Sequence, residues 1–355
     1  MTAEPAEPRT GDPGDRDATP AVSVVIPCYG HAAYLPVALD SVAAQGEGVE
    51  TVVVDDGSPD PEATARVVER RPSVRFLARP HAGVSAARNA GLEACRGRFV
   101  LFLDADDRLL PAAIEAGLDR FARRPEAGYV HGRYRFIHED GSPAGQPVAD
   151  PPALSSYLAL VRENYIGMLA TVLFRTSVVR EAGGFRTDLL VAEDYELLLR
   201  IARRHPIVGH DAMVAEYRRY ATSASADATR MLRGVLGVLA EERRAVAEEG
   251  APCLPGDLAP QAAELALREA FEAGERFFKL FYGTRVVRQI FHEGVLRGRL
   301  ASAGRWSGDL WRGLGPRLAL VSLPPAVAVA AARKSRWIAR DVWRRLRGST
   351  DGPGG

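Results

Sequence analysis

Short apolar runs rich in β-branched residues alternate with helical patterns over residues 21–141, and this alternation sets the fold class. The runs that predict strands are 22–26, 51–54, 74–77 and 99–103. Helical spacing follows at 35–42 and 110–121, and Ser85 is a suitable N-cap for a helix through Cys95. Strands separated by helices form largely parallel sheets. We therefore predict an α/β fold with a doubly wound, mostly parallel sheet, whose ligands lie at the carboxyl ends of the strands.

The strand patterns continue to residue 218 and then give way to helical ones. Further strands are predicted at 128–137, 169–174 and 214–218, and a helix at 193–204. Beyond Thr222 the pattern is helical at 227–249 and 261–283. One side of the second helix carries Leu267, Phe271, Gly274, Phe278 and Phe281. We predict a disordered tail (1–20), an α/β domain (21–225), a helical C-terminal region (226–347) and a flexible tail (348–355).

Composition narrows the class of protein and its compartment. The chain has 355 residues, 46% of them apolar, and a formal charge of +1, which fits an ordinary globular protein and gives no reason to expect a nucleic-acid partner. Its three cysteines, Cys28, Cys95 and Cys253, lie far apart without metal-ligand spacing. Neither a disulfide framework nor a zinc site is therefore indicated, and we predict a cytoplasmic protein.

Neither the N-terminal segment nor the longest apolar run has the pattern of a targeting or membrane element. Residues 1–20 contain no apolar stretch of the kind that a signal peptide needs. The longest apolar run, 318–332, has 15 residues and is broken by Pro324 and Pro325. A membrane-spanning helix needs roughly 20 residues, so we predict none.

Three carboxylates follow the predicted strand at 99–103. Alternation along an extended chain would send Asp104 and Asp106 to the same side, with Asp107 next to them. Acids this close repel one another, and Mg²⁺ or Mn²⁺, completed by substrate phosphates, would relieve that repulsion. The alternative is a helix cap with a solvated turn, and the local sequence leaves both interpretations open.

Two more acidic pairs lie at the ends of predicted elements. Asp55 and Asp56 end the strand at 51–54, in a sequence that is also typical of a simple turn. Glu193 and Asp194 open the helix at 193–204, where acids also complement the helix dipole.

Taken together, these motifs and their order resemble the family 2 glycosyltransferases with the GT-A fold. The motifs are VSVVIPCY (22–29), VVDDGS (53–58), GVSAARNAG (83–91), FLDADD (102–107), GGF (183–185) and EDYEL (193–197). The resemblance covers roughly residues 21–225 and so includes several independent motifs.

The resemblance implies a nucleotide-sugar site. Pro27, Tyr29 and Asp56 would line the nucleoside pocket, with Asp56 accepting a hydrogen bond from the base. Arg88 would lie close to the nucleotide, although a structural ion pair with nearby acids is an equal alternative. Glu193 would belong to the same donor site.

The resemblance also implies a metal site and a base. In the DXD element Asp104 would face the ribose and Asp106 the divalent cation, Mg²⁺ or Mn²⁺, and Asp107 is a substitute metal ligand. Asp194 would be the catalytic base of an inverting transfer, by direct displacement, from a nucleotide-diphosphate sugar to an acceptor hydroxyl. The alternative function is a non-catalytic nucleotide-sugar binding or scaffold module with a helical tail that binds a partner or a membrane.

One residue departs from the family's pattern. Where the family often has Tyr-Arg-x-His, with a metal-binding histidine, this chain has Tyr220 after Tyr217-Arg218-Arg219. A neutral phenol is a poor ligand for Mg²⁺ or Mn²⁺, so weaker metal binding is expected. His81 and His131 are isolated histidines, for which we predict a packing or surface role.

The acceptor is not identified by any motif. A saccharide, a lipid-linked group or another hydroxyl compound would fit the reaction. The residues in regions that could line an acceptor channel, and that fit the protein core equally well, are Tyr134, Phe136, Tyr165, Ile166, Gly167 and Met168.

A basic segment near the C-terminus leaves two interpretations open. Residues 333–347 carry seven basic residues and one acid, interleaved with Trp337, Trp343 and aliphatic side chains. Such a helix can lie on an anionic membrane surface, or it can pack on the α/β domain with its arginines in solvent.

Overall fold

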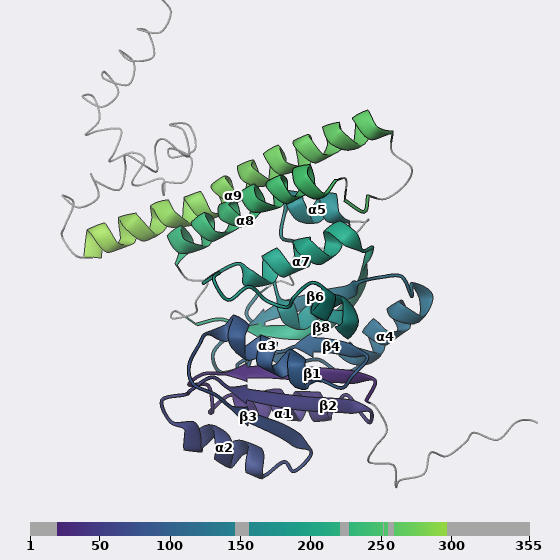
Figure 1. The fold of residues 1–355 in the computed structure, drawn as a ribbon. Helices are drawn as coiled ribbons and strands as arrows, with labels where there is room; N and C mark the ends of the chain where they lie inside the picture. The colour runs from purple at the N-terminus through teal and green to yellow at the C-terminus, as the bar shows by residue number, and fades with distance from the viewer. Residues whose placement is uncertain (1–19, 146–155, 221–226, 251, 255–258, 297–355) are drawn as a thin grey trace, which may run out of the picture.

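The computed structural model describes residues 20–145, 156–220, 227–250, 252–254 and 259–296 (Figure 1). The predictions for residues 1–19, for the apolar run at 318–332, for the basic segment 333–347 and for 348–355 therefore lie outside the described residues. Within the described ranges, no helix combines the length and the apolar character needed to cross a membrane.

The described residues form one mixed sheet of eight strands, in the order β3-β2-β1-β4-β7-β6-β8-β5. The strands are β1 (Val22–Cys28), β2 (Val49–Asp55), β3 (Val74–Ala78), β4 (Phe99–Phe102), β5 (Arg108–Leu109), β6 (Tyr129–Ile137), β7 (Val172–Arg175) and β8 (Ile207–Arg218). Strand β7 is antiparallel to both β4 and β6, and β6 is parallel to β8. Because β1, β2, β3 and β4 are also parallel to one another, the carboxyl ends of six strands meet at one edge of the sheet.

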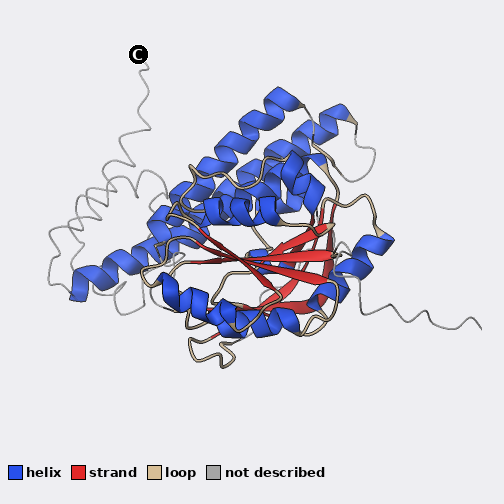
Figure 2. Cartoon of the chain, turned by 60° about the horizontal axis from the view of Figure 1, so that its bottom comes forward, coloured by secondary structure: helices blue, strands red, loops and turns tan. Residues whose placement is uncertain are grey.

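Helices cover both faces of the sheet (Figure 2). They are α1 (Leu35–Ala43), α2 (Pro61–Glu69), α3 (Val84–Ala94), α4 (Ala113–Arg123), α5 (Tyr157–Arg162), α6 (Thr176–Glu181), α7 (Glu193–Arg204), α8 (Ala228–Glu249) and α9 (Pro260–Leu296). Side chains of α1, α2 and α4 pack in the core on one face, and those of α3, α5, α6 and α7 in the core on the other. Helices α8 and α9 lie side by side beyond α5 and α7 (Figure 1).

The two cores follow from the alternation of side chains along buried strands. In β1, Val24 and Ile26 belong to one core and Val25 to the other, and all three are fully buried. Strand β4 divides in the same way between Leu101 and Phe102. Runs of apolar residues without polar alternation are therefore expected for these central strands, because both faces are covered.

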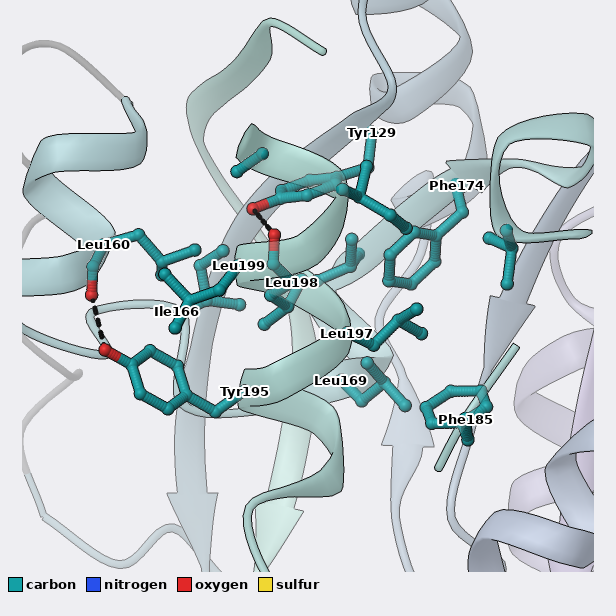
Figure 3. Packing of buried hydrophobic residues seen from close by; sticks show 14 of the residues in the cluster. Tyr129, Leu160, Ile166, Leu169, Phe174, Phe185, Tyr195, Leu197, Leu198 and Leu199 are labelled. Carbon is teal, nitrogen blue, oxygen red and sulfur yellow. Dashed lines mark hydrogen bonds between the residues drawn. The ribbon is translucent and has the colours of Figure 1, made fainter. Parts of the chain in front are cut away.

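Helix α7 is fixed in the core by two buried phenols (Figure 3). The hydroxyl of Tyr195 donates to the carbonyl of Leu160 at 2.9 Å, and that of Tyr129 donates to the carbonyl of Leu198 at 3.4 Å. Buried hydroxyls that find partners in this way hold the helix at defined points. The first turn of α7, which carries the EDYEL motif, is consequently held in place against the sheet.

Several element boundaries differ from the prediction. Helix α3 begins at Val84 with Gly83 at the N-cap position, so Ser85 is not the cap and is buried within the first turn. Strand β8 begins at Ile207, seven residues before the predicted start, and residues 169–171 form a 3₁₀ turn before β7. In α9, Phe271 and Phe278 of the predicted apolar side are buried, but Phe281 is 39% exposed.

Four short elements were not predicted: α2, α5, α6 and β5. The signals for α2 were present, since Pro61 occupies its first turn and Asp60 caps it by accepting a 3.0 Å hydrogen bond from the Ala63 N–H. The other three have six residues or fewer, too short for hydrophobic periodicity to show.

Candidate active site

Most of the predicted site residues lie just beyond strand ends at the shared carboxyl edge of the sheet. Tyr29 follows β1, Asp56 follows β2, the acidic turn at 104–107 follows β4, and Tyr220 follows β8. The topology therefore brings together residues that lie as far apart in the sequence as Tyr29 and Tyr220.

Asp56 is buried and organises the loop after β3. Its carboxylate accepts hydrogen bonds from the N–H groups of Gly83 at 2.8 Å and Ala82 at 3.2 Å. The ring of His81 lies with Nδ1 2.9 Å from the same carboxylate and stacks on Tyr29, with 4.2 Å between ring centroids. Tyr29 and His81 thus form a half-exposed aromatic pair. The hydrogen-bonding capacity of the Asp56 carboxylate is used largely by the loop after β3.

The DDG turn needs a glycine for two reasons. Gly57 has φ of +70°, a left-handed conformation that favours glycine. A Cβ at this position would lie 2.6 Å from the backbone nitrogen of His81. The turn after β2 therefore packs directly on the loop that carries His81, and Pro27 lies buried in the adjacent β1.

The acidic motif after β4 forms a turn. Strand β4 ends at Phe102, and the Asp107 N–H donates to the carbonyl of Asp104 at 3.0 Å. The extended chain that we assumed for Asp104 and Asp106 is therefore not formed, because both residues lie in a turn. The three carboxylates instead have different partners: Arg88 for Asp104, Tyr220 for Asp106 and the Arg218 N–H for Asp107.

Arg88 connects the acidic turn to α7. Its guanidinium, 4% exposed, donates to Asp104 at 2.8 Å and to Glu193 at 2.9 Å. Burial acts to lower the pKa of Arg88, but the charges of Asp104 and Glu193 outweigh it, and the pKa is raised. The ion-pair interpretation of Arg88 is thus realised in this structure, and the pair fixes the first turn of α7 beside the end of β4.

The GGF motif is held by the residue next to Arg88. Asn89 exchanges two hydrogen bonds of 2.8 Å with the backbone N–H and carbonyl of Phe185. Gly184 has φ of +70°, and a Cβ there would lie 2.5 Å from the Asn89 side-chain oxygen. The ring of Phe185 in turn lies 5.3 Å from the Arg88 guanidinium. These contacts therefore link the motifs at 83–91 and 183–185 to each other, next to the ion pairs of Arg88.

Asp194 lies in the first turn of α7, where the chain enters through Ala192 at φ 61°. Burial, and then the charge of Glu193, raise the pKa of Asp194 to about 6, against the opposing charge of Arg88. A carboxylate with a pKa near the working pH is suited to accept a proton from a hydroxyl and remains ionised at neutral pH.

Asp106 is paired with Tyr220 and His31. The hydroxyl of Tyr220 donates to its Oδ2 at 2.6 Å, and Nδ1 of His31 lies 3.9 Å from its Oδ1. The Tyr220 hydroxyl is also 3.2 Å from Nε2 of His31. Burial and the charge of Asp104 raise the pKa of Asp106. His31 was not predicted, although its place just past the end of β1 was a signal that could have suggested it.

The donor set fits a divalent cation that takes further ligands from a substrate. The Asp104 side chain is 42% exposed, and its carboxylate and that of Asp106 are oxygen donors of the kind that Mg²⁺ and Mn²⁺ prefer. The described residues contain no group of three or more His, Cys, Asp or Glu side chains that could hold an ion by themselves. Asp107 is buried and accepts the Arg218 N–H at 2.8 Å, which favours a structural role for it.

Most residues proposed for the acceptor channel are core residues. Tyr134, Ile166 and Met168 are buried, and Gly167, at φ +65°, has no room for a Cβ because it would lie 2.6 Å from the Tyr134 hydroxyl. His131 is also buried, as its predicted packing role requires. Phe136 and Tyr165 are partly buried.

Comparison with solved structures supports the GT-A fold. The structure of TarS 1–349 from S. aureus in complex with UDP-GlcNAc aligns with a TM-score of 0.58 at 20% identity, over 84% of this chain and 82% of that one. A mannosyltransferase, PcManGT from Pyrobaculum calidifontis in complex with GDP-Man and Mn²⁺, aligns with a TM-score of 0.53 at 20% identity, over 90% of this chain and 88% of that one. The predicted fold class is confirmed.

Comparison of sequences identifies the family. An uncharacterized protein of Mycobacterium tuberculosis is 33% identical over 252 residues, which are 64% of this chain and 75% of that protein. The chain spans between 19% and 61% of the length of the other curated relatives that it matches here. Residues 23–178 match the sequence model described as glycosyl transferase family 2. With the motifs, the fold and this match in agreement, this chain belongs to glycosyltransferase family 2.

Proposed function

We propose that this chain transfers a sugar from a nucleotide-diphosphate sugar to an acceptor hydroxyl by a single displacement with inversion. The observation that carries the proposal is the Arg88 bridge, which links Asp104 at 2.8 Å to Glu193 at 2.9 Å. It joins the candidate donor site to the helix turn that bears Asp194. The complexes of TarS with UDP-GlcNAc and of PcManGT with GDP-Man support a donor of this class.

In this mechanism Asp194 takes the proton of the acceptor hydroxyl as its oxygen attacks the anomeric carbon. The attack comes from the face opposite the leaving nucleoside diphosphate, so one displacement inverts that carbon. Tyr29 and Asp56 are proposed to border the nucleoside, with Pro27 supporting them from β1. Arg88 is proposed to orient Asp104 and Glu193 rather than to neutralise the donor's phosphates, because these two carboxylates already balance its charge.

Asp104 and Asp106 would hold Mg²⁺ or Mn²⁺. A bound divalent cation supplies positive charge that offsets the charge developing on a leaving diphosphate. The Mn²⁺ present with GDP-Man in the PcManGT structure supports this assignment.

A thermal-shift panel of UDP-, GDP- and dTDP-sugars with and without Mn²⁺ identifies the donor, because a ligand that binds the folded state raises the melting temperature. Donor hydrolysis is then measured for the wild type and for Asp194→Asn. We expect the variant to keep the thermal shift and to lose roughly 10²-fold to 10⁴-fold in rate. Wild-type turnover by Asp194→Asn contradicts the assigned base, whereas saturable binding without turnover by either protein supports the non-catalytic module.

Peripheral contact with a membrane through residues 333–347 is a separate proposal, supported by the basic and Trp-containing sequence alone. Flotation of the full chain with liposomes containing anionic lipid tests it. We expect replacement of Trp337 and Trp343 by Ala to reduce the bound fraction. Equal flotation of both proteins contradicts the proposal.

A further inference from the structure

His31 follows β1 and lies beside the acidic turn after β4. Its Nδ1 atom is 3.9 Å from Oδ1 of Asp106, and its Nε2 atom is 3.2 Å from the hydroxyl of Tyr220. The same hydroxyl donates to Oδ2 of Asp106 at 2.6 Å. Tyr220 therefore joins one atom of each neighbour, Nε2 of His31 and Oδ2 of Asp106. The other atoms of this pair, Nδ1 and Oδ1, are the ones that lie 3.9 Å apart.

The hydrogen bonds fix which nitrogen of His31 carries the proton. A phenol has one hydroxyl proton, and Tyr220 donates it to the carboxylate of Asp106. In the contact with His31, Nε2–H is then the donor and the phenol oxygen the acceptor. Nδ1 of the neutral imidazole consequently carries a lone pair, and within the described part of the chain no group forms a hydrogen bond with it. Histidines that bind metals are arranged in this way, with the second ring nitrogen donating to a neighbouring group.

The backbone and the ring of His31 are both held in place. Its carbonyl accepts hydrogen bonds from the N–H groups of Tyr34 at 3.0 Å and Leu35 at 3.1 Å, where α1 begins. Its ring lies edge-on to the rings of Tyr34 and Tyr220, with interplanar angles of 86° and 88°. The imidazole is thus positioned beside the acidic turn by the fold itself.

The separation of the two atoms matches the size of a metal ion. Bonds of about 2.0–2.2 Å on each side, typical of divalent ions that bind nitrogen and oxygen, can span roughly 4 Å. The side chain of His31 is 37% exposed and that of Asp106 is 13% exposed, so an ion can reach both from solvent. As a first-row transition metal, Mn²⁺ can take an imidazole nitrogen together with carboxylate oxygens, whereas Mg²⁺ takes oxygen ligands.

We propose that His31 is a nitrogen ligand of the divalent cation, next to Oδ1 of Asp106, and that Mn²⁺ is the ion it selects. The pair supplies two ligand atoms, and further oxygens, among them the phosphates of the donor, complete the site. This agrees with the lack, among the residues that the structure describes, of any group of three or more side chains that could hold an ion alone. The alternative is an ion pair between a protonated His31 and Asp106, in which no nitrogen binds the metal. This inference rests on the proposed function.

The test uses the full chain with Mn²⁺ alone and with Mn²⁺ plus UDP or GDP. Pulsed EPR of the bound ion detects the nitrogen nucleus of an imidazole that coordinates it. The variants are His31→Ala and His31→Gln. The matched control is His81→Ala, because His81 is a 55% exposed histidine that also lies beside an aspartate, with Nδ1 2.9 Å from the carboxylate of Asp56.

We expect a nitrogen signal in the wild type and in His81→Ala, and none in the two His31 variants. The Kd for Mn²⁺ alone, measured from the free-ion EPR signal, should rise at least about tenfold in His31→Ala and stay unchanged in His81→Ala. Melting temperatures close to that of the wild type show that the variants keep their fold.

The failures of the two proposals differ. A bound ion without a nitrogen signal in the wild type overturns the role of His31 and leaves the cation at Asp106 in place. A nitrogen signal that survives in both His31 variants overturns it as well. If the wild type binds Mn²⁺ neither alone nor with UDP or GDP, the cation site of the proposed function is wrong, and the inference falls with it.

Discussion

The hydroxyl of Tyr220 donates a 2.6 Å hydrogen bond to Oδ2 of Asp106. These two residues come from the ends of β8 and β4, and the bond places a neutral phenol against the carboxylate proposed to hold the cation. Burial and this bond raise the pKa of Tyr220, so it stays protonated and acts as a donor rather than as a metal ligand. Oδ2 of Asp106 is therefore already engaged by the protein.

Replacing this phenol by an imidazole should tighten metal binding. Tyr220→His removes the donor to Asp106 and supplies a nitrogen that can coordinate Mn²⁺. We expect the Kd for Mn²⁺ to fall in Tyr220→His, measured by the loss of the free-ion EPR signal. Tyr220→Phe, which removes the hydroxyl without adding a ligand, is the control, and equal affinity in the His and Phe variants contradicts the idea.

The central part of the fold was predictable because its signals are local. Strands β1, β2 and β4 are largely buried on both faces, so each contains a run of consecutive apolar residues. The reversed direction of β7 was not predictable. Tertiary packing decides which neighbours a strand pairs with and in which direction, and a four-residue apolar run contains no local signal for either.

The residues of the site were easier to predict than the contacts between them. The motifs located Asp56 and Asp106, which lie just past the ends of β2 and β4 at one edge of the sheet, and Asp194, which lies in the first turn of α7. The bond between Arg88 and Glu193 spans 105 positions, and the approach of His31 to Asp106 depends on loop geometry. Neither can be derived from spacing. The extended backbone assumed for Asp104 and Asp106 was wrong, because a turn forms there.

The Arg88 bridge should contribute strongly to folding. Arg88→Met leaves Asp104 and Glu193 without a counter-charge, and breaking a buried pair costs about 3–5 kcal/mol. Because Asp104 is 42% exposed, we expect a loss toward the lower end of that range in urea denaturation. Arg66→Met, which breaks an exposed pair with Glu62, should cost less than about 1 kcal/mol. Similar losses in the two variants contradict a special role for Arg88.

The contact of Gly184 with Asn89 can be separated from backbone strain. Gly183 and Gly184 both have positive φ, +85° and +70°, but a Cβ at Gly183 meets nothing within 4 Å. At either position the left-handed backbone conformation destabilises an alanine. Only Gly184→Ala also displaces the Asn89 side chain. We expect the free energy of unfolding of Gly184→Ala to be lower than that of Gly183→Ala by about 1–3 kcal/mol. Equal values contradict the steric argument.

The raised pKa of Asp194 predicts an acid limb in the rate. Asp194 must be ionised to accept a proton, and its pKa of about 6 makes kcat/KM level above that pH and about tenfold lower for each unit below it. The charge of Glu193 raises the pKa of Asp194, so removing that charge should lower the pKa and move the acid limb to lower pH. Arg88, with one partner fewer, then shifts the pKa of Asp194 in the same direction. The pH profile of kcat/KM for donor hydrolysis in Glu193→Gln checks this, and a limb that stays in place or moves to higher pH assigns the titration to another group.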